Sequence, residues 1–571
     1  MAVYEDGAES TLQGPLDALI VGAGFSGMYQ LYSLRDRLGL SVRVLEAAED
    51  VGGTWYWNRY PGARCDSESH SYCYYFSDEL LTEWEWSERY PEQPEIMRYL
   101  NFVADRLDLR RDIQFRTRVT SAAYDEARNL WVVETSNGEH FETIYLITAV
   151  GCLSSANIPA IPGLSTFEGD WHHTGHWPHE GVDFTGKRVG QIGTGSTGIQ
   201  AAPVIAAQAA HLTVFQRTAN YSVPARNAPL DPEFKRYIKE NRNEIRELIQ
   251  STPNGHPFRI SDIKVFDVSD EERQAIYEAA WKKGGLQFRA SFQDLLINAE
   301  ANETASAFLK EKIREIVKDP QMAEALAAID HPYAAKRPPI DTGYFETFNR
   351  ENVSLVDLRK EPIEAITPKG VRTTAGEYEL DIIVFATGFD AMTGPLLSID
   401  ICGRGGVLLK DAWRDGPETY LGLQVSGFPN MFTITGPGSP SVLCNMPPAI
   451  EQHVEWITNC IAYMRENDFT TIEASSSAQK AWVQHVNETA DLTLLPRVAH
   501  SWYLGANVPG KPRVFMPYAG GLQRYRTICE DIAAMDYEGF ALTGSDPSSR
   551  KEHKSSIGRL SIRMAADSPG V

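Results

Sequence analysis

Three glycines near the N-terminus have the spacing of a phosphate-binding loop. Gly22, Gly24 and Gly27 form a G-x-G-x-x-G pattern within the segment DALIVGAGFSGMYQLYSLRD. In such a loop the first glycine makes a tight turn, the second lets the backbone approach a pyrophosphate, and the third lets strand and helix pack closely. The start of the following helix offers backbone N–H groups to the phosphates. The pattern therefore predicts a dinucleotide site.

The same pattern occurs a second time, in the segment KRVGQIGTGSTGIQAAPVIA, with Gly193, Gly195 and Gly198. In the first copy the expected second strand ends at Glu46, and in the second copy it ends at Arg217. Both residues lie 24 positions after the first glycine of their loop (46 − 22 and 217 − 193). Equivalent places in the two copies therefore carry opposite charges.

This charge difference predicts two different nucleotides. A carboxylate at this place accepts hydrogen bonds from a ribose diol, whereas a guanidinium pairs with a 2′-phosphate. Glu46 therefore favours FAD or NAD, and Arg217 favours NADP(H). The alternative for Arg217 is a solvated charge at the end of a strand.

The apolar pattern predicts the strands and helices that hold these loops. A buried-strand run at 18–21 precedes the first loop, and Met28, Leu31 and Leu34 follow at helical intervals. Each copy closes with a hairpin pattern and a buried strand, which end at Gly151 and Gly388. Residues 224–332 instead show helical periodicity. We interpret their many charges as a solvated face and assign them no chemistry.

These patterns predict an α/β fold with two dinucleotide-binding, Rossmann-like domains and a helical insertion in the NADP domain. The expected parts are an FAD-binding domain (1–150 and 387–545), a linker with the first part of the NADP-binding domain (151–223), a helical subdomain (224–332), the second part of the NADP-binding domain (333–386) and a flexible C-terminal tail (546–571).

Composition limits the possible partners and the compartment. The chain has 571 residues and a formal charge of −22, which disfavours nucleic acid and anionic membranes as partners. The sequence has no run of about 18 consecutive apolar residues, so we expect no membrane-spanning helix. The N-terminus lacks the profile of a signal peptide. The chain has seven cysteines, an odd number, and no CxxC pair. This argues against a disulfide framework and against a cysteine metal site. We expect a cytoplasmic monomer.

A segment between the two copies indicates a family. FEGDWHHTGHWP fits F-x-G-x-x-x-H-x-x-x-W-P, with Phe167, Gly169, His173, Trp177 and Pro178. It resembles the fingerprint of the Type I Baeyer–Villiger monooxygenases. The segments GGTWYWNRYPGARCD, GTGSTGIQ, ATGFD and GANVPGK also fit, so the resemblance covers nearly the whole chain and is nearest to the phenylacetone and cyclohexanone monooxygenases.

The resemblance implies a specific reaction. NADPH reduces a tightly bound FAD, O₂ is the cosubstrate, and a C4a-peroxyflavin converts a small-molecule ketone to an ester or lactone, without a metal. Sulfoxidation is implied as a second reaction. In this family the arginine matching Arg337 stabilises the oxygen anions, and the aspartate matching Asp66 orients it. A buried structural ion pair is the alternative for these two residues.

Further contacts are implied only by resemblance. His173 would serve the linker and its movements, and Trp502 would close over NADP and substrate, unless it is ordinary loop packing. The remaining flavin contacts would be Phe25, Ser26, Gly53, Thr54, Trp55, Tyr72, Val119 and Met446. The remaining NADP contacts would be Thr194, Ser196, Thr197, Gln200, Thr218 and Lys336. The substrate pocket would include Val442, Leu443, Cys444 and Met446.

Two other functions stay open at this point. An N-hydroxylating or flavin-containing monooxygenase acting on amines or sulfides shares both glycine loops, although the linker motif differs. A non-catalytic flavin or NADPH sensor would also keep the loops, but it has no need for Asp66 and Arg337. A disulfide reductase is excluded because no redox cysteine pair follows the first loop.

Replacing Arg217 by alanine tests the assignment of the second loop. We expect the variant to lose about 1.5–3 kcal/mol of affinity for NADPH, the range for a hydrogen bond to a charged group. Affinity for NADH, which lacks the 2′-phosphate, should change little. Dissociation constants for both nucleotides check this, and an equal loss for both would contradict the assignment.

Overall fold

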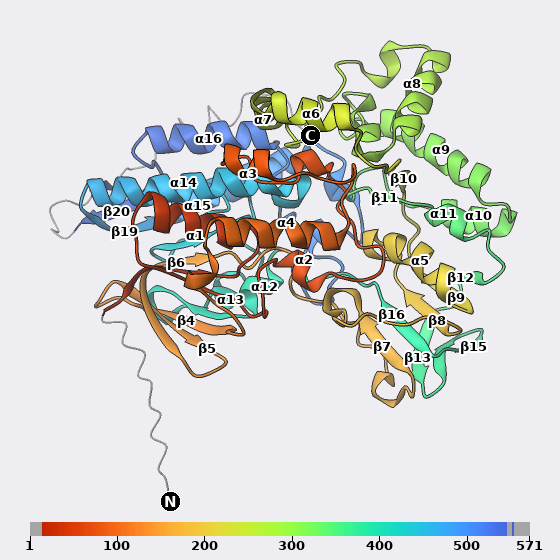
Figure 1. The fold of residues 1–571 in the computed structure, drawn as a ribbon, viewed down its shortest axis with the longest axis horizontal. Helices are drawn as coiled ribbons and strands as arrows, with labels where there is room; N and C mark the ends of the chain where they lie inside the picture. Colours follow the sequence, from red (N-terminus) through yellow and green to blue (C-terminus); the bar gives the residue numbers. More distant parts are fainter. Residues whose placement is uncertain (1–13, 545–550, 553–571) are drawn as a thin grey trace, which may run out of the picture.

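The computed structural model describes residues 14–544 and 551–552. Two separate sheets, each with helices packed against it, organise the chain (Figure 1). All but two residues of the predicted C-terminal tail lie outside the described residues. Within the described part, no helix combines the length and apolar character needed to cross a membrane.

The first sheet has a parallel centre. β1 (Leu16–Val21) lies between β2 (Val42–Leu45) and β6 (His140–Thr148), and β3 (Ile113–Gln114) follows β2. Apart from Asp17, the sequence LDALIV of β1 is apolar because helices cover it. β4 (Val119–Asp125) and β5 (Leu130–Thr135) extend the sheet as an antiparallel meander that ends in β6.

Two strands of the first sheet come from the far end of the chain. β17 (Asp400–Cys402) pairs with β4, and β18 (Met431–Thr433) pairs with β6, both in parallel. The helices of this unit are α1 (Phe25–Tyr32, continued by a π-helical turn), α4 (Gln93–Arg106), α14 (Met446–Glu466), α15 (Ser476–Asp491) and α16 (Leu522–Ala534). A small antiparallel sheet lies beside them: β19 (Phe469–Ala474), β20 (Phe540–Gly544) and β21 (Lys551–Glu552).

The second sheet is parallel throughout. Its order is β12 (Val353–Asp357), β9 (His211–Gln216), β8 (Arg188–Ile192), β16 (Ile382–Phe385) and β7 (Asp170–His173). α5 (Ser196–Gln208) follows β8 and packs against the sheet. A meander of β13 (Ile363–Thr367), β14 (Gly370–Thr373) and β15 (Gly376–Glu379) precedes β16. The predicted α/β class with two Rossmann-like units is confirmed.

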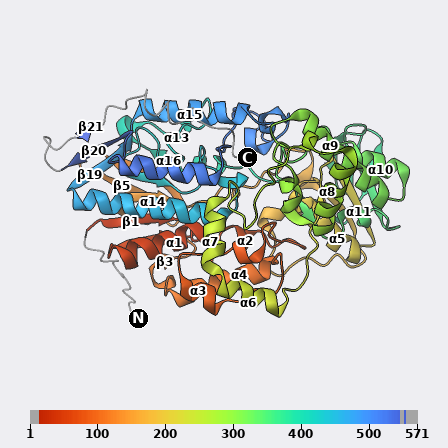
Figure 2. The same ribbon diagram turned by 90° about the horizontal axis from the view of Figure 1, so that it is seen from above.

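The helical segment after β9 contacts both units. It contains α6 (Pro232–Glu240), α7 (Arg242–Ser251), α8 (Asp270–Lys283), α9 (Ala299–Ile316) and α10 (Pro320–Ala327). Ile245 and Ile249 of α7 belong to the core of the first unit, whereas Tyr277 of α8 and Phe308 of α9 belong to the core of the second. Figure 2 shows α7 lying across the helices of the first unit while α8, α9 and α10 gather near α5.

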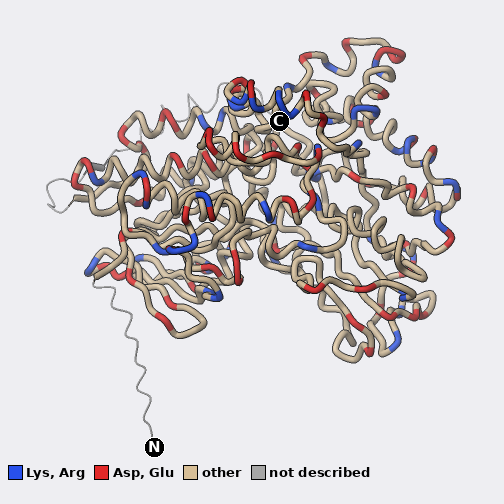
Figure 3. The backbone as a smooth tube through the Cα atoms, viewed as in Figure 1, with Lys and Arg blue, Asp and Glu red and all other residues tan. Residues whose placement is uncertain are grey.

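Short elements complete the chain: α2 (Thr54–Trp57), α3 (Asp78–Glu83), β10 (Val223–Pro224), β11 (Ile340–Asp341), α11 (Tyr344–Thr347), α12 (Gly394–Leu397) and α13 (Leu409–Ala412). Acidic and basic residues alternate along the outer helices and loops, as Figure 3 shows for α8, α9 and α10. The formal charge of −22 is therefore spread over the molecule rather than gathered in one patch.

The third glycine of each loop is required for packing. A Cβ atom on Gly27 would collide with the carbonyl oxygen of Gly22, and a Cβ atom on Gly198 would collide with that of Gly193. A Cβ atom on Gly195, in contrast, would meet nothing within 4 Å. The strand–helix contact and the open approach to the loop therefore depend on different glycines.

The pair Gly198→Ala and Gly195→Ala tests this division. We expect Gly198→Ala to destabilise the second unit by about 1–3 kcal/mol, because an added methylene in a filled contact forces the backbone to move. Gly195→Ala should unfold at the wild-type urea concentration. Urea titrations of both variants check this, and equal stability of the two would show that the close contact does not limit packing.

Candidate active site

Both glycine loops have the geometry of a pyrophosphate site. α1 and α5 begin after Gly24 and Gly195, which are extended and carry no side-chain cap. The first N–H groups of each helix therefore remain available to an anion. In the first unit Gly24 lies against Gly53, and an added Cβ on Gly24 would be 3.3 Å from the Cα atom of Gly53. Only glycine leaves space for a ligand between these two segments.

Glu46 lies at the first glycine loop. Its carboxylate accepts the backbone N–H of Ala23 at 2.6 Å and that of Ala48 at 2.7 Å. Burial raises the pKa of the Glu46 carboxyl, although the two backbone N–H groups oppose this rise. The carboxylate is therefore fixed beside the loop, where a ribose diol on a bound dinucleotide would meet it.

Arg217 and Lys336 form a cationic pair at the second loop. Arg217 is exposed at the end of β9, and no ion pair is found for either residue within the described part of the chain. Burial lowers the pKa of the Lys336 ammonium; the nearby Asp330 carboxylate opposes this, and the charge of Arg217 lowers the pKa further. Beside them, the Thr194 hydroxyl donates to the carbonyl of Thr218 at 2.8 Å. Two close cations favour an anion such as a phosphate.

A bidentate ion pair joins the two units. Arg337 donates from Nε to Asp66 Oδ2 at 2.5 Å and from Nη2 to Asp66 Oδ1 at 2.8 Å. Its Nη1 donates to the carbonyl of Val442 at 2.7 Å. Asp66 follows α2 of the first unit, Arg337 precedes β11, and Val442 precedes α14. Three segments far apart in the sequence therefore fix one guanidinium.

The pair keeps both charges. Burial alone would raise the pKa of the Asp66 carboxyl, but the Arg337 guanidinium outweighs burial and holds this pKa below its ordinary value. Burial alone would likewise lower the pKa of the Arg337 guanidinium. The Asp66 carboxylate outweighs burial and raises this pKa above its ordinary value. Each side chain is about one fifth exposed (21% and 22%), so the pair borders an accessible space.

A pocket lies beside Arg337, and it corrects one interpretation of the sequence. Val442 and Leu443 line it, as the resemblance implied. Five residues of the helical segment, which we assigned no chemistry, also line it: Asn254, His256, Phe258, Leu286 and Arg289. They lie outside the periodic helices, either after α7 or in the 3-10 segment Gly285–Ser291, so the helical pattern gave no signal for them. Tyr503 lines the pocket, whereas Trp502 packs next to it, with ring centroids 4.5 Å apart.

The fingerprint residues lie at the edge of the second sheet. β7 ends at His173, whose Nδ1 accepts the N–H of Gly175 at 3.0 Å. Burial lowers the pKa of the His173 imidazole to about 4, so it is neutral. A Cβ atom on Gly169 would collide with the carbonyl of Asp381, and Trp177 is buried. Phe167 packs against the core around β16. These contacts fit a linker role.

The other residues implied by resemblance lie as follows. The Trp55 indole donates to the Tyr72 hydroxyl at 3.0 Å, and Phe25 packs edge-on against Tyr72. The Gln200 amide is held by Tyr60 and the carbonyl of Arg64, which couples α5 to the first unit. Ser26 lies in the first turn of α1, Ser196 and Thr197 in the first turn of α5, Thr54 begins α2, Val119 begins β4 and Met446 begins α14. Cys444 is buried, and burial raises the pKa of its thiol to about 12.

Comparison with known proteins gives the class. Residues 17–227 match the flavin-binding monooxygenase-like family. The chain is 46% identical to cyclohexanone 1,2-monooxygenase of Acinetobacter sp. over 92% of this chain and 96% of that protein. It is 45% identical to a Baeyer–Villiger monooxygenase of Pseudooceanicola batsensis over 95% of this chain and 98% of that one. A solved structure of oxidized steroid monooxygenase bound to NADP superimposes with a TM-score of 0.89 at 52% identity, and covers 93% of this chain and 100% of that one.

The chain therefore belongs to the flavin-binding monooxygenases. Within them it is a member of the Baeyer–Villiger monooxygenase family, as the linker fingerprint indicated.

The Asp66–Arg337 pair predicts a pH-dependent stability. Because the folded-state pKa of Asp66 is lowered, its contribution is complete above the ordinary carboxyl pKa of about 3.9 and is lost as pH falls through the lower folded value. We expect Asp66→Asn to cost about 2–3 kcal/mol, less than a fully buried pair because both side chains are partly exposed. The cost should be equal at about pH 8 and about pH 5.

Asp411→Asn is the matched control, since Asp411 pairs with Arg414 in the open, where the two side chains are 53% and 74% exposed. It should change stability by less than about 0.5 kcal/mol. Denaturant titrations at both pH values measure these changes, and a control that loses as much as Asp66→Asn would refute a special role for the pair.

Proposed function

We propose that this protein converts ketones to esters or lactones, using NADPH and O₂ with bound FAD. One observation carries the proposal: a guanidinium that Asp66 and Val442 hold rigidly at the wall of a pocket, where the two nucleotide units meet. When bound, FAD reduced by NADPH supplies the oxygen activation, so the protein needs only to bind, orient and stabilise charge.

Arg337 is suited to stabilising a negatively charged oxygen. A guanidinium stays charged at working pH and cannot give its proton away, so it stabilises an anion without quenching it. It has five N–H groups, and Asp66 and the nearby carbonyls occupy at most four of them in this structure. At least one donor is left for an oxygen of the substrate. Asp66 acts through Arg337, as a positioning residue.

The nucleotides are assigned to the two loops. We propose that FAD binds the first unit, formed by 1–150 and 387–545, with Glu46 on its ribose. This is supported by β17 and β18, which return to the first sheet. NADPH would bind the unit formed by 151–223 and 333–386, with Arg217 and Lys336 on the 2′-phosphate and the segment 224–332 as its insertion. The further contacts inferred from resemblance are part of this proposal.

The thiols support a proposal about the compartment of the protein. All seven cysteines are free, as a reducing compartment requires. We propose that the protein works as a monomer in the cytoplasm on small-molecule ketones. Sedimentation of the holoenzyme tests the oligomeric state. The relatives differ in substrate: a phenazine N-monooxygenase of Lysobacter antibioticus is 44% identical over 93% of this chain and 98% of that protein. Amine and sulfide substrates therefore belong in any assay.

Arg337→Ala tests the proposed function. A panel of linear, cyclic and aryl ketones is incubated with NADPH, FAD and O₂, and the products are scored by mass spectrometry as esters or lactones. We expect the wild type to form them and the variant to form about 100- to 1000-fold less, the usual effect of removing one oxyanion donor. NADPH should still reduce the flavin of the variant. Ester formation at the wild-type rate by Arg337→Ala would remove the proposed role.

A further inference from the structure

A second arginine lines the pocket without a partner. Arg289 belongs to a 3-10 segment, Gly285–Ser291, and lies in the pocket wall together with Arg337, His256 and Tyr503. Its Nη2 is completely enclosed and has no hydrogen-bond partner. Among the described residues no carboxylate pairs with it, and burial lowers the pKa of its guanidinium.

The charges around this pocket do not balance. Asp66 is the acid in contact with Arg337, and both of its oxygens are taken by that arginine. His256 is neutral, because burial and Arg337 lower the pKa of its imidazole to about 3. The pocket therefore holds two guanidinium groups and one carboxylate. An enclosed guanidinium N–H without a partner, such as that at Nη2 of Arg289, is unfavourable unless a ligand compensates it.

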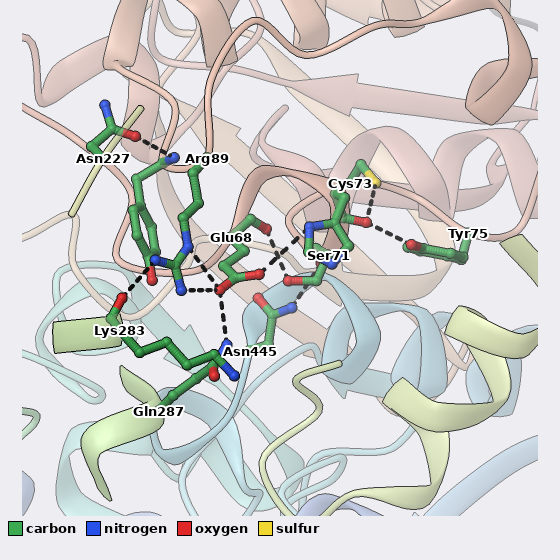
Figure 4. Close-up of polar contacts among 11 residues, drawn as sticks. Glu68, Ser71, Cys73, Tyr75, Arg89, Asn227, Lys283, Gln287 and Asn445 are labelled. Carbon is green, nitrogen blue, oxygen red and sulfur yellow. Dashed lines mark hydrogen bonds and ion pairs between the residues drawn. The ribbon is translucent and has the colours of Figure 1, made fainter. Parts of the chain in front are cut away.

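Glu68, a second acid that acts on His256 of this pocket, is occupied elsewhere. Glu68 accepts from Arg89 Nε at 3.0 Å and Nη2 at 2.7 Å, and from Gln287 Nε2 at 3.1 Å (Figure 4). Arg89 also donates to the carbonyl of Lys283 at 2.9 Å. These bonds neutralise Glu68 and tie Gln287 of the Arg289 segment, and Lys283 just before it, to the first unit.

The backbone also fixes this segment. Gly285 has a φ of +72°, and a Cβ atom there would collide with the Tyr90 hydroxyl. Phe288 is fully buried and stacks on Tyr277 with ring centroids 5.6 Å apart. Phe288 is held by the core of the second unit and Gln287 by Glu68 of the first unit. The side chain of Arg289 is therefore held at the pocket rather than in solvent.

We propose that Arg289 is a specificity-determining residue that binds an anionic group of the substrate, so that the preferred substrates are ketones carrying a carboxylate. This inference rests on the proposed function and names its substrate class. Guanidinium and carboxylate match in a bidentate geometry, and a carboxylate would supply the missing charge. Arg337 would meet the ketone end of the same molecule, and Arg289 its anionic end.

The test compares acids with neutral partners of the same shape. One pair is para-acetylbenzoate and para-acetylbenzamide, and further pairs are linear methyl-ketone acids of increasing length with their methyl esters. The ratio of kcat/KM for acid over neutral partner is measured for wild type, Arg289→Met, Arg289→Lys and Arg414→Met. Arg414 is the matched control, because it is an exposed arginine that pairs with Asp411 away from the pocket.

We expect the wild type to prefer the acid in at least one pair. Arg289→Met should lower this ratio by about 10- to 100-fold, the effect of one charged hydrogen bond. Arg289→Lys should keep part of the preference, and Arg414→Met should keep all of it. An acid-to-neutral ratio that is the same in wild type and Arg289→Met overturns the inference.

A binding measurement separates this inference from the proposed function. Calorimetric titration of the holoenzyme with para-isopropylbenzoate, which has no ketone, reports on the anion site without turnover. Binding that Arg289→Met abolishes, together with no ester from any ketone, would leave the anion site and remove the proposed function. Turnover of neutral ketones with no binding of this acid would support the proposed function and remove the anion site.

Discussion

The contact between Asp66 and Arg337 is the interaction on which the site depends. Each partner comes from a different nucleotide unit, and a third segment, at Val442, accepts a further N–H of the guanidinium. A buried charge pair of this kind adds little net stability compared with apolar packing, since desolvation offsets the attraction. Its value lies in geometry: it is satisfied only when the two sheets and the segment before α14 are correctly assembled.

The same assembly explains how the first and second sheets share one pocket. Neither sheet alone provides its walls. Residues 254–258 and 285–291 of the helical segment form part of them, beside residues of the first unit. Polar contacts cross this boundary at Glu68 and Tyr60 of the first unit: Gln287 donates to Glu68, and Tyr60 donates to Gln200 of the second unit. Movement of one unit relative to the other would therefore change the surroundings of Arg337 and Arg289 together.

The sequence predicted the parts of the site that depend on local backbone geometry. Gly22 and Gly193 have positive φ angles of +103° and +113°, and Gly27 and Gly198 pack against the carbonyls of Gly22 and Gly193, so all four must be glycines and their spacing alone reveals them. Asp66 and Arg337 were found only by resemblance, since 271 positions separate them. Arg289 and His256 were missed, because their importance comes from what surrounds them in three dimensions. A charge in a helical segment resembles any solvated charge until its neighbours are known.

The free cysteines have a consequence for the working life of the protein. An enzyme that handles O₂ exposes its own side chains to oxidants, and a thiol is attacked mainly as the thiolate. Six of the seven thiols are buried, and only Cys402 is partly accessible. Burial raises the pKa of Cys65, Cys73, Cys152 and Cys444, which lie in the first unit or near the pocket. These sulfurs remain protonated, so the fold protects them from sulfenic acid formation.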